Sequence, residues 1–181
     1  MKTFEFCIIA SGVDPEAEDF GDRFYDAGCD DALVAFQKGH TIIDFAREAE
    51  TLAEAIASAV DNVCAAGATI DRIEPDPLVN LSDIAARTEL TRAAISKYAK
   101  AEASRKFPAP IARVTSAEPL WDWSEVATWM VQNKQLPVEV AVAAGVIKEA
   151  NAAIGRGEFH MRKILTETAD KEKTFLQSLA A

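Results

Sequence analysis

The chain has 181 residues, of which 49% are hydrophobic and 27% charged, a composition that excludes intrinsic disorder and suits one large or two small domains. No stretch approaches the roughly 20 apolar residues of a membrane span. The N-terminal sequence MKTFEFCIIASG lacks the pattern of a signal peptide, so we expect a cytoplasmic protein with no membrane contact. Cys7, Cys29 and Cys64 are widely spaced without a CxxC pair, which predicts free, buried thiols in a reducing compartment.

The net charge of −10 is distributed unevenly along the chain. Residues 1–77 hold 5 basic and 17 acidic side chains, whereas residues 78–132 and 133–181 each hold 7 basic and 6 acidic ones. The acidity is therefore confined to the N-terminal segment, which phosphate groups would repel. If the chain binds a nucleic acid, we expect this segment to face away from it.

The first 75 residues alternate between strand and helix signals. Phe4, Phe6 and Ile8 alternate along a strand, and Pro15 after Asp14 is typical of a helix start. The predicted elements are a strand at 3–10, a helix at 14–27, strands at 31–37 and 41–45, a helix at 50–66 capped by Thr51, and a strand at 69–74. The order β-α-β-β-α-β predicts a ferredoxin-like domain over residues 1–75 within an α+β protein. Pro75-Asp76-Pro77 ends it, because two prolines around one residue stop strand and helix alike.

Residues 81–100, LSDIAARTELTRAAISKYAK, predict two short helices joined by a tight turn. Ile84 lies on the first helix beside Ala85, whose small side chain lets the second helix cross closely. Leu90 lies in the turn, and Ile95 and Tyr98 continue the apolar face on the second helix. This is the spacing of a helix-turn-helix, whose second helix enters the major groove of DNA.

The residues that follow predict a β-hairpin and a further helix. An FPAP segment at 107–110 leads into two short strands around the polar turn 115–119. Trp121 and Trp123 alternate on the second strand and so point to opposite faces, one toward the core with Trp129. For the other, exposure is the alternative, and we expect core packing for both. Ser124 is a suitable N-cap for the helix that starts there.

This succession resembles the winged helix-turn-helix of MerR-type regulators and phage excisionases. In those proteins an FPxP segment leads into a hairpin that ends in an aromatic residue, followed by an S-E-V-x-x-W helix, here Ser124–Trp129. The resemblance covers residues 78–132, less than a third of the chain. Glu89 departs from it at a turn position that usually holds Gly, and residues 101–106 make a longer connector than is typical.

The C-terminal segment, residues 137–181, is predicted to be helical. One helix is expected from Val138 to Ile154 and a second from Glu158 to Leu179, separated by Gly155-Arg156-Gly157. The second helix carries an apolar stripe: Met161, Ile164, Leu165, Thr168, Phe175, Leu176 and Leu179. The stripe packs either against its own chain or against a second copy. The resemblance favours the second option, because MerR-type proteins commonly dimerise through C-terminal helices.

Residues out of phase with Ile95 and Tyr98 on the second helix are expected to face the groove. Arg92, near the N-terminus of that helix, is the first choice for a bidentate contact to guanine. Thr91 caps the helix and suits a phosphate, and the connector and wing (residues 107–123) supply further cations. The predicted DNA-binding residues are Thr91, Arg92, Ser96, Lys97, Lys100, Arg105, Lys106 and Arg113.

Other chemistries find little support in the sequence. His40 and His160 belong to no metal-ligand spacing, and a zinc site from Cys29, His40 and Cys64 lacks a motif. Neither a phosphate-binding glycine loop nor a nucleophile motif is present. We therefore expect no enzyme, no cofactor and no metal. The carboxylates of 14–26 and 30–31 are read as a solvated face, with docking of a basic protein or mimicry of nucleic acid as the alternatives.

Two functional hypotheses follow from these patterns. The first is a dimeric, sequence-specific transcriptional regulator that binds double-stranded DNA at a two-fold site, autoregulatory or antitoxin-like, whose N-terminal domain binds a small molecule or a protein. The second is a protein-interaction adaptor whose winged helix does not bind DNA, which the overall acidity favours.

Overall fold

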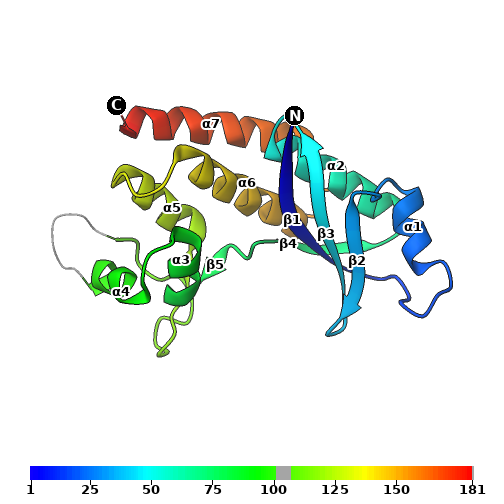
Figure 1. Ribbon diagram of the computed structural model, residues 1–181, viewed down its shortest axis with the longest axis horizontal. Helices are drawn as coiled ribbons and strands as arrows, with labels where there is room; N and C mark the ends of the chain where they lie inside the picture. The colour runs from blue at the N-terminus through cyan, green and yellow to red at the C-terminus, as the bar shows by residue number, and fades with distance from the viewer. Residues whose placement is uncertain (101–106, 181) are drawn as a thin grey trace. The chain divides into compact units, whose positions relative to one another are not determined.

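The computed structural model (Figure 1) describes residues 1–100 and 107–180, with side chains as far as Ser178. It confirms a mixed α+β protein, with a four-stranded antiparallel sheet and seven helices among these residues. The chain forms two compact units. Unit 1 comprises Met1–Pro75 and Val146–Ala169, and unit 2 comprises Asp76–Gly145 and Asp170–Ala181. The predicted segment 137–181 is thus divided between both units. Within the described part of the chain, no helix combines the length and the apolar character needed to cross a membrane.

Unit 1 contains the six elements expected from the sequence, in the expected order. They are β1 (Lys2–Ser11), α1 (Phe20–Asp26), β2 (Ala32–Gln37), β3 (His40–Ala49), α2 (Leu52–Ala65) and β4 (Thr69–Glu74). The strands lie in the order β2-β3-β1-β4, and each neighbouring pair is antiparallel. Helix α2 packs against β1, β3 and β4 (Figure 1), and Ile8, Ile43, Ile56 and Ile73 are fully buried in this core.

The first helix is shorter than the sequence suggested. A helix from Asp14 was expected, but α1 begins only at Phe20, so this boundary was wrong. The carboxylate of Asp14 accepts the backbone N–H of Glu16 at 3.0 Å, and its carbonyl oxygen accepts that of Ala17 at 3.3 Å. An Asp side chain that bonds two residues ahead favours a turn over a helix. A succession of turns therefore replaces the first part of the predicted helix.

The hairpin of β2 and β3 has the two-residue loop that its sequence indicates. Lys38 and Gly39 both have positive φ, 53° and 83°, as a type I′ turn requires. The register is regular from Gln37↔His40 to Ala32↔Phe45. Strand β3 runs four residues beyond the predicted 41–45, because alternate side chains up to Arg47 remain buried. Helix α2 begins at the predicted cap, where the Thr51 hydroxyl accepts the N–H of Glu54 at 3.2 Å.

Unit 2 is built from short elements around tryptophan side chains. It holds β5 (Leu78–Val79), α3 (Leu81–Thr88), α4 (Arg92–Lys100), β6 (Trp121–Asp122) and α5 (Trp123–Gln132), and it shares α6 (Val138–Gly155) and α7 (Arg162–Ala180) with unit 1. Ile84, Ile95, Val126 and Met130 are fully buried in one cluster with the three tryptophans.

The predicted hairpin of the wing is reduced to one bridge. Ala112 pairs with Leu120, and residues 113–119 form a loop between them. Beyond Leu120 the chain pairs instead with β5, in the register Leu78↔Asp122 and Val79↔Trp121. The predicted second strand of the wing is therefore shorter, because Trp121 and Asp122 at its end pair with β5, which precedes α3 and α4 in the sequence.

The start of α5 differs by two residues from the prediction. Asp122 is the N-cap, not Ser124, and its carboxylate accepts the N–H of Ser124 at 2.8 Å and that of Glu125 at 3.3 Å. Trp123 is consequently the first residue of α5 and not a strand residue. Both Trp121 and Trp123 are buried, so the expected core packing of the pair is confirmed.

The C-terminal stripe is partly buried within the chain. Helix α7 begins at Arg162, later than the predicted Glu158. Met161, Leu165 and Leu176 are buried, whereas Phe175 is 51% exposed, and the Leu179 side chain lies outside the described residues. This burial is the intrachain packing that the sequence left open, and a homodimer through the stripe stays a prediction.

The cysteines follow the prediction in part. All three are free thiols. Cys29 is buried and Cys7 is half-buried, but Cys64 is exposed on α2, so the expectation of burial was wrong for Cys64.

Candidate nucleic-acid interface

Helices α3 and α4 form a firmly capped pair. The Asn80 side chain accepts the N–H groups of Ser82 and Asp83, and the Asp83 carboxylate accepts the N–H of Asn80 at 2.9 Å, a capping box that satisfies the first turn of α3. Helix α3 ends at Thr88, and its C-cap residue, Glu89, has the left-handed φ of 56°. The turn thus adopts the conformation that glycine favours, without a glycine.

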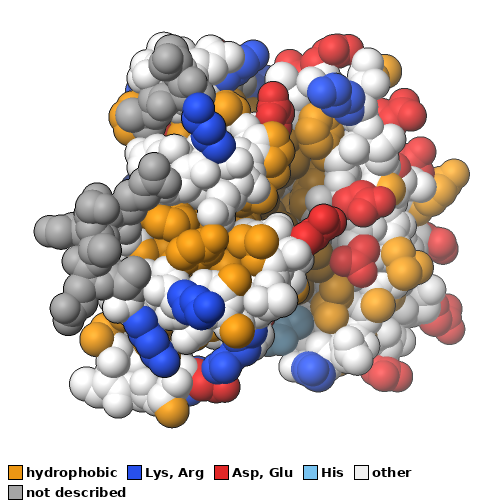
Figure 2. All heavy atoms as spheres, turned by 60° about the vertical axis from the view of Figure 1, so that its left-hand side comes forward, with side chains coloured by type: hydrophobic (Ala, Val, Ile, Leu, Met, Phe, Trp, Pro, Cys, Tyr) orange, Lys and Arg blue, Asp and Glu red, His pale blue; other side chains and the backbone are white. Residues whose placement is uncertain are grey.

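Helix α4 presents cations and no carboxylate to the outside. The Thr91 hydroxyl accepts the N–H of Ala94 at 3.1 Å and caps the helix, while Ile95 turns inward and is fully buried. Of the predicted contact residues, Ser96 is half-buried; the others in and beside α4 are exposed: Thr91, Arg92, Lys97 and Lys100. Figure 2 shows lysine and arginine side chains at the surface between apolar and uncharged ones.

Arg92 lies where three segments of unit 2 meet. It lines a small cavity of about 20 Å³ together with the first turn of α3, from Asn80 to Ser82, and the turn 117–119 of the wing. The structure therefore brings the start of α4, the start of α3 and the tip of the wing to one place. Glu118 belongs to the same lining, so one acidic residue borders this cavity together with Arg92.

The wing carries exposed side chains of two kinds. Arg113 is exposed and has a positive φ of 51°, and its carbonyl oxygen accepts the N–H of Ser116 in a tight turn. Ile111 and Val114, which flank Arg113, are 55% and 61% exposed. The sequence analysis did not single out these two apolar residues. The remaining predicted contacts, Arg105 and Lys106, lie outside the described residues.

An aromatic cluster holds α4 and the FPAP segment together. The Tyr98 ring stacks against Phe107, with ring centroids 6.5 Å apart, and packs at a tilt against Trp129, at 5.2 Å. Its hydroxyl accepts a hydrogen bond from Gln135 at 2.8 Å. The indole N–H of Trp121 donates to the Pro108 carbonyl oxygen at 3.0 Å. The cluster fixes both ends of the segment that joins α4 to the wing.

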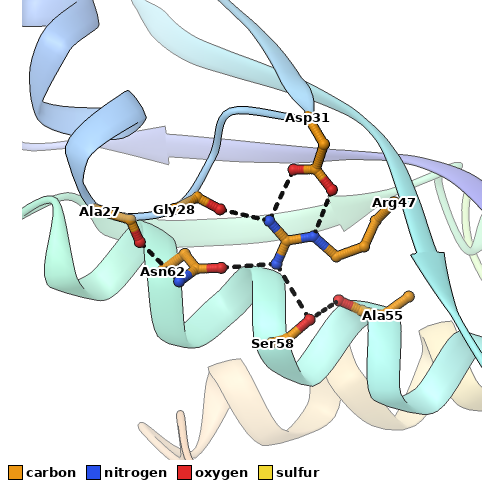
Figure 3. A network of polar contacts seen from close by, with 7 residues as sticks. All are labelled: Ala27, Gly28, Asp31, Arg47, Ala55, Ser58 and Asn62. Carbon is orange, nitrogen blue, oxygen red and sulfur yellow. Dashed lines mark hydrogen bonds and ion pairs between the residues drawn. The ribbon is translucent and has the colours of Figure 1, made fainter.

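Unit 1 contains a second polar cluster, centred on Arg47 (Figure 3). Its guanidinium makes a two-point contact with the Asp31 carboxylate, both bonds 2.8 Å long, and donates to the Gly28 carbonyl oxygen at 2.8 Å. It also donates to Ser58 at 3.1 Å and to Asn62 at 2.7 Å. The hydrogen bonds from Arg47 hold the pKa of the Asp31 carboxyl below its usual value.

The Arg47 guanidinium has no donor left for a ligand. A guanidinium has five N–H groups, and Arg47 uses them in the five hydrogen bonds given above. The cluster therefore ties β3 to α2 and to the loop before β2, and it does not offer an anion site. The sequence analysis missed Arg47, although the alternation Ile43, Phe45, Arg47 places it on the buried face.

Among the described residues, no three His, Cys, Asp or Glu side chains are grouped so that they could hold a metal ion. Comparison of the chain with protein-family models, with curated proteins and with solved structures found no match.

Proposed function

We propose that the chain is a sequence-specific DNA-binding transcriptional regulator, with a winged helix-turn-helix of the MerR or excisionase type at residues 78–132. The observation that carries the proposal is α4, which holds Arg92, Lys97 and Lys100 and no Asp or Glu. A capped α3 and the burial of Ile84 and Ile95 in one apolar cluster support an α4 that stays rigid while its outer face is free to enter a major groove.

In this proposal unit 1 supplies a ferredoxin-like domain that senses a ligand or binds a partner. The strand order β2-β3-β1-β4 and the succession β-α-β-β-α-β support that assignment. Its carboxylates would be repelled by phosphate, so it would contribute regulation and not DNA contact.

The test is footprinting of the purified protein on DNA from around its own gene, at two salt concentrations. A two-fold protected site whose affinity falls with salt is the expected result. R92A should cost about 1–3 kcal/mol of binding free energy if it reads a base, and K97A should lower the salt slope by about 1 if it contacts a phosphate. The double variant K171A/K173A removes the same charge from exposed positions of α7 and should bind like the wild type.

A non-DNA-binding adaptor is the second candidate, favoured by Glu118 beside Arg92. Binding that is absent at low salt, or equal in R92A/K97A and the wild type, would select the adaptor. In that case E118Q should leave DNA binding as it is in the wild type, whereas under the regulator hypothesis it should raise the affinity, because one repulsive carboxylate is removed.

A further inference from the structure

The two edge strands of the sheet in unit 1, β4 and β2, differ in whether their outward backbone groups have partners. At the β4 edge, the side-chain amide of Asn151 on α6 donates to the Ile73 carbonyl oxygen and accepts the Ile73 N–H, both at 2.9 Å. One side chain thereby imitates a neighbouring strand and satisfies the outward N–H and C=O of Ile73. This edge is blocked at Ile73.

The β2 edge is open. Strand β2 is the last in the order β2-β3-β1-β4, and the described residues place no strand beside it (Figure 1). In an antiparallel pair, the backbone N–H and C=O groups of successive residues alternate between bonding the neighbouring strand and pointing away from it. Gln37 and His40 close a two-residue turn. Gln37, Ala35 and Leu33 therefore direct their backbone N–H and C=O groups toward β3. Val34 and Phe36 turn their N–H and C=O groups outward.

The side chains of β2 do nothing to block strand addition. The sequence ALVAFQ has no proline and no charge, and its pairing with β3 shows no bulge. Leu33 is 71% exposed and Phe36 48%. Natural edge strands usually carry a charge, a proline or a bulge that prevents pairing with another chain. A regular, uncharged edge with exposed apolar residues is instead suited to bind a further strand.

We propose that β2 is a dimerisation edge at which a second copy of this chain adds its own β2, antiparallel and centred on Val34. The two Val34 residues would exchange both backbone hydrogen bonds. The N–H of each Phe36 would donate to the Ala32 carbonyl oxygen of the other copy, which leaves the Ala32 N–H on its existing bond to Cys29. The pairing is isologous, as a two-fold dimer requires.

Charge and shape favour a second copy as the occupant in this register. Leu33 of each copy lies across from Ala35 of the other, so a large apolar side chain meets a small one. Beyond the strand ends, the same register brings the turn that holds Asp30 of one copy toward the turn that holds Lys38 of the other, twice, and both residues are exposed. The acidic excess of residues 1–77 opposes this approach, so added salt should strengthen the dimer.

Sedimentation of the full chain without DNA tests the proposal, and its outcome does not depend on DNA binding. The wild type should show a monomer–dimer equilibrium that shifts to dimer with salt. L33K/A35K places like charges across the pairing and should be monomeric throughout. The matched control I111K/V114K makes the same change at exposed apolar positions of the wing and should dimerise like the wild type.

Two results would overturn the proposal. One is a wild type that stays monomeric from micromolar to near-millimolar concentration at every salt level. The other is a dimer that survives L33K/A35K but is lost in F175K, which would assign the interface to α7.

Disulfide trapping tests the register itself. In a C64S background, L33C/A35C should give a covalent dimer on oxidation, because these positions face each other as a non-hydrogen-bonded pair with Cα atoms about 4.5 Å apart. L33C/Q37C would cross-link only if the pairing were shifted by two residues. Efficient trapping of the second pair and not of the first would refute the pairing centred on Val34.

Discussion

Gly28 is the position at which a single methyl group should do most damage. Its φ is +91°, and a Cβ there would lie 2.9 Å from the Asn62 side-chain nitrogen. Asn62 cannot retreat without giving up its bonds to Arg47 and to the Ala27 carbonyl oxygen, both 2.7 Å long. Strain and lost hydrogen bonds therefore add at one site.

We expect G28A to lower the free energy of unfolding by about 2–4 kcal/mol, measured by urea denaturation. G39A is the control, because Gly39 also has a positive φ, +83°, but a Cβ added there would have no neighbouring atom within 4 Å. That variant should lose only about 1 kcal/mol. Equal losses in both variants would show that the contact with Asn62 contributes nothing.

The Cys7 thiol lies in a row of side chains across the sheet, between Glu74 and Asp44. Burial, with a hydrogen bond to Asp44 and the charges of both carboxylates, raises the pKa of Cys7 to about 12. The thiolate is the nucleophile, so Cys7 should react slowly with iodoacetamide near neutral pH. D44N removes one charge and should lower that pKa.

Alkylation of Cys7, followed by mass spectrometry of its peptide, should therefore be faster in D44N than in the wild type. D22N removes the same charge from α1 and should leave the rate unchanged. A Cys7 that reacts as fast as the exposed Cys64 in the wild type would contradict the assignment.

Asn151 shows how a single side chain completes an element. Replacing it by leucine keeps much of the volume but leaves the N–H and C=O of Ile73 without their partner. N151L should therefore lower the free energy of unfolding by about 1–3 kcal/mol. Hydrogen exchange should show faster exchange of the Ile73 amide, while the amide of Phe24 in α1 keeps its rate. An unchanged Ile73 rate would mean that the edge is closed by other means.

Local signals determined most of the elements and failed where distant segments compete. Alternation and caps predicted the strands of unit 1, α2 and the pair α3–α4 from residues close in sequence. The wing was mispredicted because Trp121 pairs with Val79, more than forty residues earlier. The contact between Asn151 and Ile73, seventy-eight residues apart, could not be predicted from local sequence either. The basic face of α4 was predictable because Ile95 and Tyr98 fix its phase, whereas the presence of Glu118 and Arg92 in the lining of one cavity depends on the folded chain.

At the scale of the whole molecule, α6 and α7 belong to both units. Leu165 of α7 is buried in unit 1, and Leu176 of the same helix is buried in the core of unit 2. Each L→A change should cost about 2–5 kcal/mol. Hydrogen exchange should show the loss of protection in residues 1–75 for L165A and in residues 76–145 for L176A. Equal loss in both ranges for either variant would mean that the units unfold as one.

The closed β4 edge limits how far sheets of this protein can grow. Strands that pair edge to edge can continue without end when both edges are free, and this is how cross-β fibres extend. Here the Asn151 amide occupies one edge, so two copies joined at β2 present only blocked edges to any third. Strand pairing therefore stops at a dimer. A mutation that exposes the backbone of Ile73 would let strand pairing continue from one copy to the next.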